Sequence, residues 1–137
     1  MVLTKVTIPR LLALAEFIYK NLTFVRHIAL MGMEPIGFAR ANWDTLWIDP
    51  VDYQRELAAA VEYLSRRKMP VSVYNLPMCV VSQSIRRFAR QSISDWKNVS
   101  LPVCEPCILR GDCAGFFAST QPRSISRGIC PVLATEG

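Results

Sequence analysis

Three cysteines lie close together in the run VCEPCILRGDCAGFF, with the spacing C-x2-C-x5-C that Cys104, Cys107 and Cys113 make. Two thiolates two residues apart can bind one metal centre, because a tight turn brings both sulfur atoms to the same side. The third thiolate closes the other side of the loop. Such a site usually takes one more ligand, and the chain has two further cysteines, Cys79 and Cys130. The sequence therefore predicts a site for zinc or for an iron–sulfur cluster, since four thiolates suit both.

The cysteine count and the first residues bear on the compartment. Five cysteines is an odd number, whereas a disulfide framework favours an even count and a signal peptide. The apolar run near the start is interrupted by Glu16 and no A-x-A-like site follows, so it predicts an amphipathic helix. No stretch reaches the roughly 18 apolar residues of a membrane span. We expect a cytoplasmic protein without a membrane partner, where clustered cysteines bind metal more often than they form disulfides.

The first part of the chain reads as an α/β fold. A helix is expected at about 8–22, a short apolar strand at about 25–31, and then an irregular loop that carries Trp43 and Trp47. Asp49 is placed to cap a second helix, and an apolar strand follows at 71–74. Alternating helices and strands favour parallel strands, and near-continuous apolar runs are typical of strands covered on both faces. Two such units are too few for a closed barrel, so the chain is expected to be part of something larger.

The texture changes after Cys79. A short basic helix is expected at about 84–91, with Ile85 and Phe88 turned inward and Arg86, Arg87 and Arg90 outside. The remainder is rich in glycine and proline and has little core of its own, so a bound metal would supply the missing stability. We expect two domains, 1–76 and 77–137.

Three segments resemble the radical SAM maturases of the His-Xaa-Ser system. They are NLTFVRHIALMGMEPIGFARANWDTLWIDPVDY, VSVYNLPMCVV and RRFARQSISDWKNVSLPVCEPCILRGDCAGFFAST, and the most specific part is SISDWKN followed by C-x2-C-x5-C-x-G-F-F. The resemblance implies the carboxyl-terminal portion of a partial (β/α) barrel, followed by a small auxiliary cluster domain of the SPASM or twitch kind. It also implies reductive cleavage of S-adenosylmethionine, used to modify a ribosomally made peptide.

The resemblance assigns roles to residues here. It implies an auxiliary [4Fe–4S] cluster on Cys104, Cys107, Cys113 and Cys79, with Cys130 left as a free thiol. Glu34 and Asn75 follow the two predicted strands, at the edge where parallel sheets bind ligands, and would contact S-adenosylmethionine. His27 is expected to be structural.

The sequence also departs from the family. Radical SAM enzymes carry C-x3-C-x2-C early in the barrel, and this chain has no such triplet. We therefore expect that the chain is not catalytically competent alone and that its partners are a missing amino-terminal half of the barrel and the peptide. Two alternatives stay open: a zinc-stabilised nucleic-acid-binding module and a stand-alone iron–sulfur electron-transfer protein. The net charge of +5 permits nucleic acid, but the lack of basic and aromatic interleaving makes it an unlikely partner.

Overall fold

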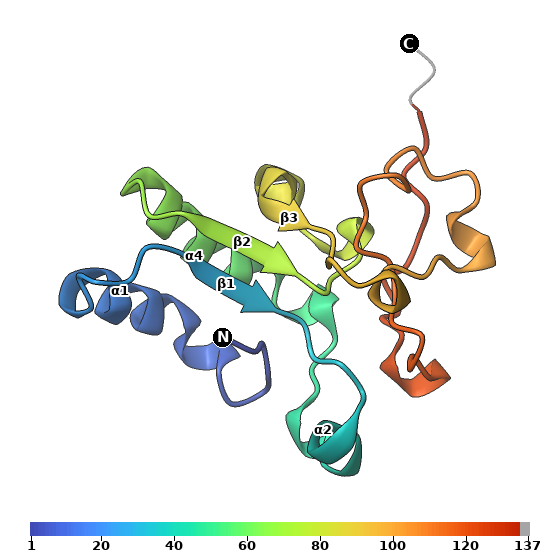
Figure 1. The fold of residues 1–137 in the computed structure, drawn as a ribbon, viewed down its shortest axis with the longest axis horizontal. Helices are drawn as coiled ribbons and strands as arrows, with labels where there is room; N and C mark the ends of the chain where they lie inside the picture. The colour runs from blue at the N-terminus through green and yellow to red at the C-terminus, as the bar shows by residue number, and fades with distance from the viewer. Residues whose placement is uncertain (135–137) are drawn as a thin grey trace.

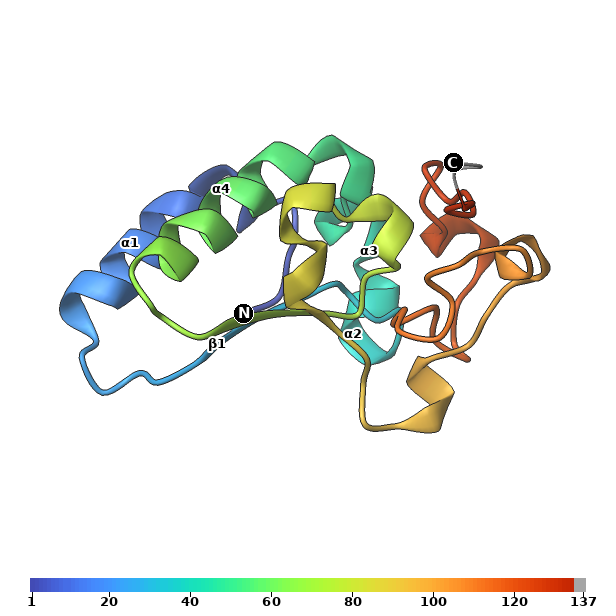
Figure 2. The same ribbon diagram turned by 90° about the horizontal axis from the view of Figure 1, so that it is seen from above.

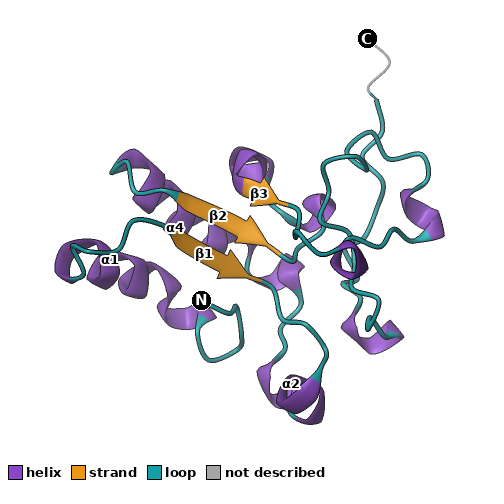
Figure 3. Cartoon of the chain, in the orientation of Figure 1, coloured by secondary structure: helices purple, strands orange, loops and turns teal. Residues whose placement is uncertain are grey.

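The computed structural model describes residues 1–134 of the chain. A small parallel sheet stands beside helices that come mostly from the first two thirds of the chain, and the last third is mainly loop (Figure 1). Figure 3 shows the same division by element type. In chain order the elements are η1 Ile8–Arg10, α1 Leu11–Asn21, β1 Ile28–Met31, α2 Gly37–Ala41, α3 Trp43–Leu46, η2 Pro50–Asp52, α4 Gln54–Arg66, β2 Val71–Tyr74, η3 Met78–Val80, η4 Gln83–Phe88, β3 Ala89–Arg90, η5 Asp95–Lys97, η6 Pro102–Cys104 and η7 Pro122–Ser124, where η marks a 3-10 helix.

The sheet has the strand order β1-β2-β3, and both pairs are parallel. Ile28 lies opposite Val71, and Val73 lies opposite Ala89. The first residues of the chain run along the other edge of β1, where the Leu3 N–H donates to the Met31 carbonyl over 2.8 Å. The chain is therefore a mixed α/β structure, as the alternating pattern predicts.

Helices α1 and α4 pack against one face of the sheet (Figure 2). Helix α4 presents a buried stripe at helical spacing, Leu57, Val61 and Leu64, because residues four and three positions apart share a face. Alternate strand residues such as Leu30 and Val73 face this stripe and are each 1% exposed. Burial of these apolar side chains provides the main stabilisation of this part of the chain.

The opposite face of the sheet is different. Its side chains are small or polar in part, and Ala29, Met31 and Tyr74 are only half-buried. Ser72 lies on this face and shares a 2.9 Å hydrogen bond with His27 Nε2. The apolar runs predict strands covered on both faces, but α1, α4 and η4 lie on the same side (Figure 2). The sequence pattern counts Ala29 as apolar, but its small side chain can be partly exposed at little cost. The pattern therefore predicts a second covered face that the described residues do not provide.

Several predicted elements are confirmed and two are corrected. The strand at 71–74 is confirmed. The Asp49 carboxylate accepts from the Val51 N–H over 3.1 Å as a cap, but it caps the 3-10 helix η2, and the longer helix α4 begins separately at Gln54. The predicted loop around Trp43 and Trp47 is wrong, because it contains α2 and α3. There the two indoles stack with centroids 5.6 Å apart, which buries Trp43. The predicted helix at 84–91 is a shorter 3-10 helix, η4, and its last residues form strand β3 instead.

The core continues through Val81 and Ile85 to Phe88, which packs against it. The boundary predicted between 76 and 77 stays a prediction, and the packing described here passes through it. Within residues 1–134, no helix has the length and apolar character needed to cross a membrane.

Candidate metal centre

All five cysteines line one cavity, and they reach it from three separate segments. Cys79 comes from η3, just after the carboxyl end of β2, and Cys130 comes from the last described segment. Cys104, Cys107 and Cys113 belong to the loop between them. Residues far apart in the sequence therefore bring their thiols to one place beside the sheet.

The turn that carries Cys79 is held by the side chain of Arg86, which is partly buried. Arg86 Nε donates to the carbonyls of Met78 and Val81, at 3.0 and 3.1 Å, on either side of Cys79. Burial raises the pKa of the Cys79 thiol; the main-chain N–H of Cys130 opposes this rise, while the neighbouring thiols of Cys113 and Cys130 add to it. Cys79 is therefore a protonated thiol at neutral pH in the metal-free chain, and a bound cation would favour its thiolate.

The sulfur of Cys113 accepts two main-chain hydrogen bonds. The Met78 N–H donates to it over 3.2 Å and the Gly115 N–H over 3.4 Å. Hydrogen bonds of this kind to sulfur stabilise thiolates and tune the metal that they bind. The first of them also ties the segment of Cys79 to the loop of Cys113.

The sulfur of Cys107 accepts a similar bond from the last described segment. The Val132 N–H donates to it over 3.4 Å, and the Val132 carbonyl accepts from the Ile108 N–H over 2.9 Å. Cys130 lies two residues before Val132, so it is held beside the cysteine loop even though its side chain is exposed. Its position makes it a second candidate for the fourth ligand, next to Cys79. The interpretation of Cys130 as a free thiol stays a prediction.

The donor chemistry of the cavity suits a thiophilic metal, because five thiols and three N–H groups converge on it. Within residues 1–134, however, no three cysteine, histidine or carboxylate side chains form a group that would hold a metal ion as they stand. The cavity measures about 20 Å³, which is room for about one water-sized body. A single ion would require the thiols to rearrange, and a four-iron cluster is larger than this cavity and would require the cavity to widen.

The two residues assigned to S-adenosylmethionine take different positions. Asn75 directly follows β2 and lies in the left-handed region with φ 63°, and its Nδ2 donates to the Gly32 carbonyl over 3.3 Å. Gly32 must be glycine there, because a Cβ would lie 2.5 Å from the Asn75 carbonyl oxygen. Glu34 lies in the loop after β1 and forms an ion pair with Lys97.

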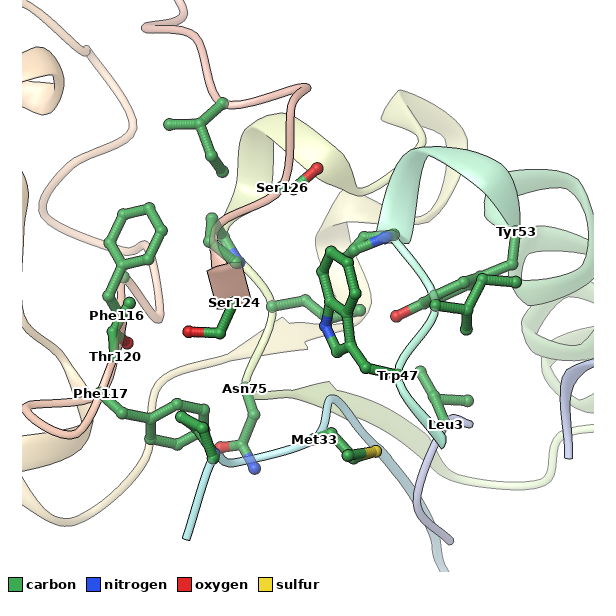
Figure 4. A pocket seen from close by; sticks show the side chains of 17 residues that line it. Leu3, Met33, Trp47, Tyr53, Asn75, Phe116, Phe117, Thr120, Ser124 and Ser126 are labelled. Carbon is green, nitrogen blue, oxygen red and sulfur yellow. The ribbon is translucent and has the colours of Figure 1, made fainter. Parts of the chain in front are cut away.

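A second cavity, of about 40 Å³, lies at the carboxyl ends of β1 and β2. Asn75 lines it, together with Trp47 and Tyr53 from the α/β part and Phe116 and Phe117 from the cysteine-containing part (Figure 4). It shares three lining residues with the cysteine cavity, which are Pro77, Gly115 and Phe116. The two cavities are therefore neighbours.

Sequence reasoning missed one group of residues near this site. The carboxylate of Asp49 is buried and accepts from the Ser126 hydroxyl and, over 3.0 Å, from the Arg127 N–H. The sequence signal for Asp49 is that of a helix cap, and a cap alone does not identify a partner 77 positions away.

Comparisons of this chain with known protein families, with curated proteins and with solved structures find no match.

Proposed function

We propose that this chain is the carboxyl-terminal part of a radical SAM maturase of the His-Xaa-Ser kind, which binds an auxiliary [4Fe–4S] cluster on Cys79, Cys104, Cys107 and Cys113. The observation that carries the proposal is the convergence of thiols from three segments on one cavity. Main-chain N–H groups already donate to two of these sulfurs, those of Cys107 and Cys113. In known clusters such bonds help to set the reduction potential.

The arrangement of the sheet supports the barrel part of the proposal. In a (β/α) barrel the strands are parallel, the helices lie outside, and the ligands bind at the carboxyl ends of the strands. Here the strands are parallel and α1 and α4 lie on one side only (Figure 2). In the proposal, the other face turns toward the barrel interior and an amino-terminal half supplies the remaining strands. Glu34 and Asn75 would then contact S-adenosylmethionine.

When bound by four thiolates, the cluster would supply electrons; only a cluster held by three of the cysteines would also offer a coordination position for the substrate. The chain's own residues hold it: the cysteines provide thiolates, Arg86 fixes the turn of Cys79, and Phe116 shields the side next to the strand-end cavity. The substrate in this proposal is a ribosomally made peptide, in the cytoplasm.

Metal analysis of the full chain tests the cluster. Protein purified without oxygen should be brown, with the broad visible absorption of thiolate–iron charge transfer, and should contain iron and acid-labile sulfide. Colourless protein with stoichiometric zinc would replace the cluster with a zinc centre, which the small cavity between the thiols favours. Protein with neither metal, after reconstitution with each, would end the proposal of a metal centre.

The nucleic-acid alternative receives less support from the arginines than their sequence positions indicate. Arg86 is occupied by two main-chain carbonyls, and Arg87 lies over the ring of Phe88 with its Cζ 4.9 Å from the centroid. Arg90 donates to the carbonyls of Arg87 and Ala89. Arg86 therefore has a structural role, whereas Arg87 and Arg90 make local contacts and remain exposed.

The catalytic part of the proposal has its own test. The chain alone should not cleave S-adenosylmethionine, because cleavage needs a cluster iron with an open coordination position, and a cluster held by four cysteines has none. Anaerobic incubation with dithionite, followed by chromatography for 5′-deoxyadenosine, measures this directly. Turnover above a no-protein control would mean that Cys104, Cys107 and Cys113 hold a three-cysteine catalytic cluster. Turnover only after addition of an amino-terminal barrel half would identify this chain as one half of a split enzyme.

A further inference from the structure

The carboxylate of Asp49 is the most heavily used acceptor among the described side chains near the cysteine-containing part. It is 8% exposed and takes hydrogen bonds from the Val51 N–H, the Ser126 hydroxyl and the Arg127 N–H. The guanidinium of Arg127 adds an ion pair, with Nη1 at 3.4 Å from Oδ2. Two of its partners, Ser126 and Arg127, belong to the segment that leads to Cys130.

The contact between these segments is close as well as polar. Gly128 packs against Val51 so closely that a Cβ on Gly128 would overlap with Val51 Cγ1. The Gly128 N–H also donates to Ser126 Oγ over 3.1 Å, and the Ile129 N–H donates to the Ser126 carbonyl over 3.3 Å. The segment 126–129 is therefore a fixed turn, anchored on Asp49 and Val51, which lie shortly before α4 in the sequence.

This anchored turn is followed at once by the residues that contact the cysteine loop. Cys130 lines the metal cavity, and Val132 bonds to both Cys107 Sγ and the Ile108 N–H. Only Ile129 separates Gly128 from Cys130 in the cavity wall, so a shift of the turn would move that wall directly.

We propose that Asp49 is a positioning residue for the metal centre, which holds segment 126–132 against the cysteine loop although it lies far from it in sequence. This inference rests on the proposed metal site. Asp49 does not contact the metal in this proposal. It acts through Ser126 and Arg127, as partners outside the ligand shell do when they orient ligands.

The neighbouring Asp52 provides a matched control. It also pairs with Arg127, but its side chain is 46% exposed and it makes no bond to the Ser126 hydroxyl or to the Arg127 main chain among the contacts described. An exposed ion pair of this kind contributes little, so Asp52→Asn removes charge near Arg127 without releasing the turn.

The experiment measures the affinity of the full metal-free chain for Zn²⁺ and Co²⁺ by competition with a chelator. Asp49→Asn replaces one carboxylate oxygen with an NH₂ group, which would face N–H and O–H donors instead of accepting from them. The affinity for the ion should fall by about 10-fold, which is the smaller effect expected when a partner outside the ligand shell is lost. Asp52→Asn should bind like wild type. The sulfur-to-cobalt charge-transfer absorption of Asp49→Asn should also change, because this band reports how many thiolates coordinate the ion.

A second variant separates positioning from folding. Ser126→Ala removes one bond between the turn and Asp49, together with the bond that Ser126 Oγ accepts from the Gly128 N–H, but it leaves the Asp49 cap on Val51, so η2 keeps its start. It should lower metal affinity with little change in the thermal unfolding of the metal-free chain. Wild-type affinity in both Asp49→Asn and Ser126→Ala would overturn the inference while leaving the metal centre intact. If the wild-type chain binds neither ion and also takes up no iron and sulfide on reconstitution, the metal centre itself is overturned, and this inference with it.

Discussion

Lys97 and Glu34 form an ion pair across 63 positions of sequence, with 3.1 Å between Nζ and Oε2 and both side chains mostly removed from solvent. Glu34 lies in the loop after β1, and Lys97 ends η5 in the segment that leads to the cysteine loop. Lys97 Nζ also lies 6.0 Å from the centroid of the Phe117 ring. The pair thus joins the carboxyl end of the sheet to the cysteine-containing part of the chain.

Replacement of Lys97 by Met should therefore destabilise the chain. The Glu34 carboxylate, 15% exposed, would lose its cation, and the cost should be about 1–2 kcal/mol, between the values for exposed and for fully buried pairs. Urea unfolding of the metal-free chain measures this cost. The double variant Glu34→Gln/Lys97→Met should recover part of it, because no unpaired charge remains. A single variant as stable as wild type would show that the pair contributes nothing.

Gly115 should tolerate no side chain. Its φ is 63°, and a Cβ would lie 2.5 Å from the Val99 carbonyl oxygen, across the bridge that pairs Val99 with Phe116. Gly115→Ala should cost about 1–2 kcal/mol from the left-handed backbone alone, and more from the contact. It should also weaken metal binding, because the Gly115 N–H donates to Cys113 Sγ. Gly111→Ala is the control, since a Cβ there meets open space and its stability should change little. Equal melting temperatures for the two variants would contradict this prediction.

The sequence predicts the regular elements of the first part well because their signals are local. The strand at 71–74 is a short apolar run between turn residues, and α4 shows its buried stripe through the spacing of Leu57, Val61 and Leu64. The cap at Asp49 is equally local, because the acceptor and the Val51 N–H are two residues apart. The short helices α2 and α3 are missed because four or five residues are too few to show the helical period in the sequence.

The candidate metal centre shows the same division. The spacing of Cys104, Cys107 and Cys113 predicts a shared loop, and the structure places all three at one cavity. The position of Cys130 at that cavity depends on hydrogen bonds of Val132 to the cysteine loop, and the turn before it depends on Asp49. Main-chain contacts between distant segments leave no pattern in one sequence, so the sequence reads this segment as a tail.

Tyr53 should make the stability of the chain fall at alkaline pH. Its side chain is 2% exposed, and burial, followed by the charge of Asp49, raises the pKa of its phenol far above the usual value. The stabilising effect is complete below the pKa of an unfolded tyrosine, about 10, and is lost as the pH rises above it, because only the unfolded chain then releases the proton. The difference in unfolding free energy between wild type and Tyr53→Phe should shrink by about 1.4 kcal/mol per pH unit above about pH 10. Urea titrations at several pH values measure it, and a difference that is constant with pH would show that Tyr53 ionises freely in the folded chain.

The identity of the fourth ligand is the sharpest prediction about the metal centre. Cys104→Ala, Cys107→Ala and Cys113→Ala should each lose most of the bound iron, because each removes a thiolate from the loop that lines the cavity. Cys79→Ala should do the same, whereas Cys130→Ala should keep its iron. The reason is that Cys79 is half-buried and its turn is fixed by Arg86 and by the Met78 N–H on Cys113 Sγ, while the Cys130 side chain is exposed.

Iron and sulfide per chain, measured after anaerobic reconstitution of each variant, decide between the two thiols. Loss in Cys130→Ala with retention in Cys79→Ala would reverse the assignment, and would mean that the Val132 contacts place the ligand that matters. Retention in both single variants with loss in the double variant would mean that the two thiols replace one another. That outcome is physically possible because both thiols line the same cavity. It would also give a role to the fifth thiol that lines this cavity.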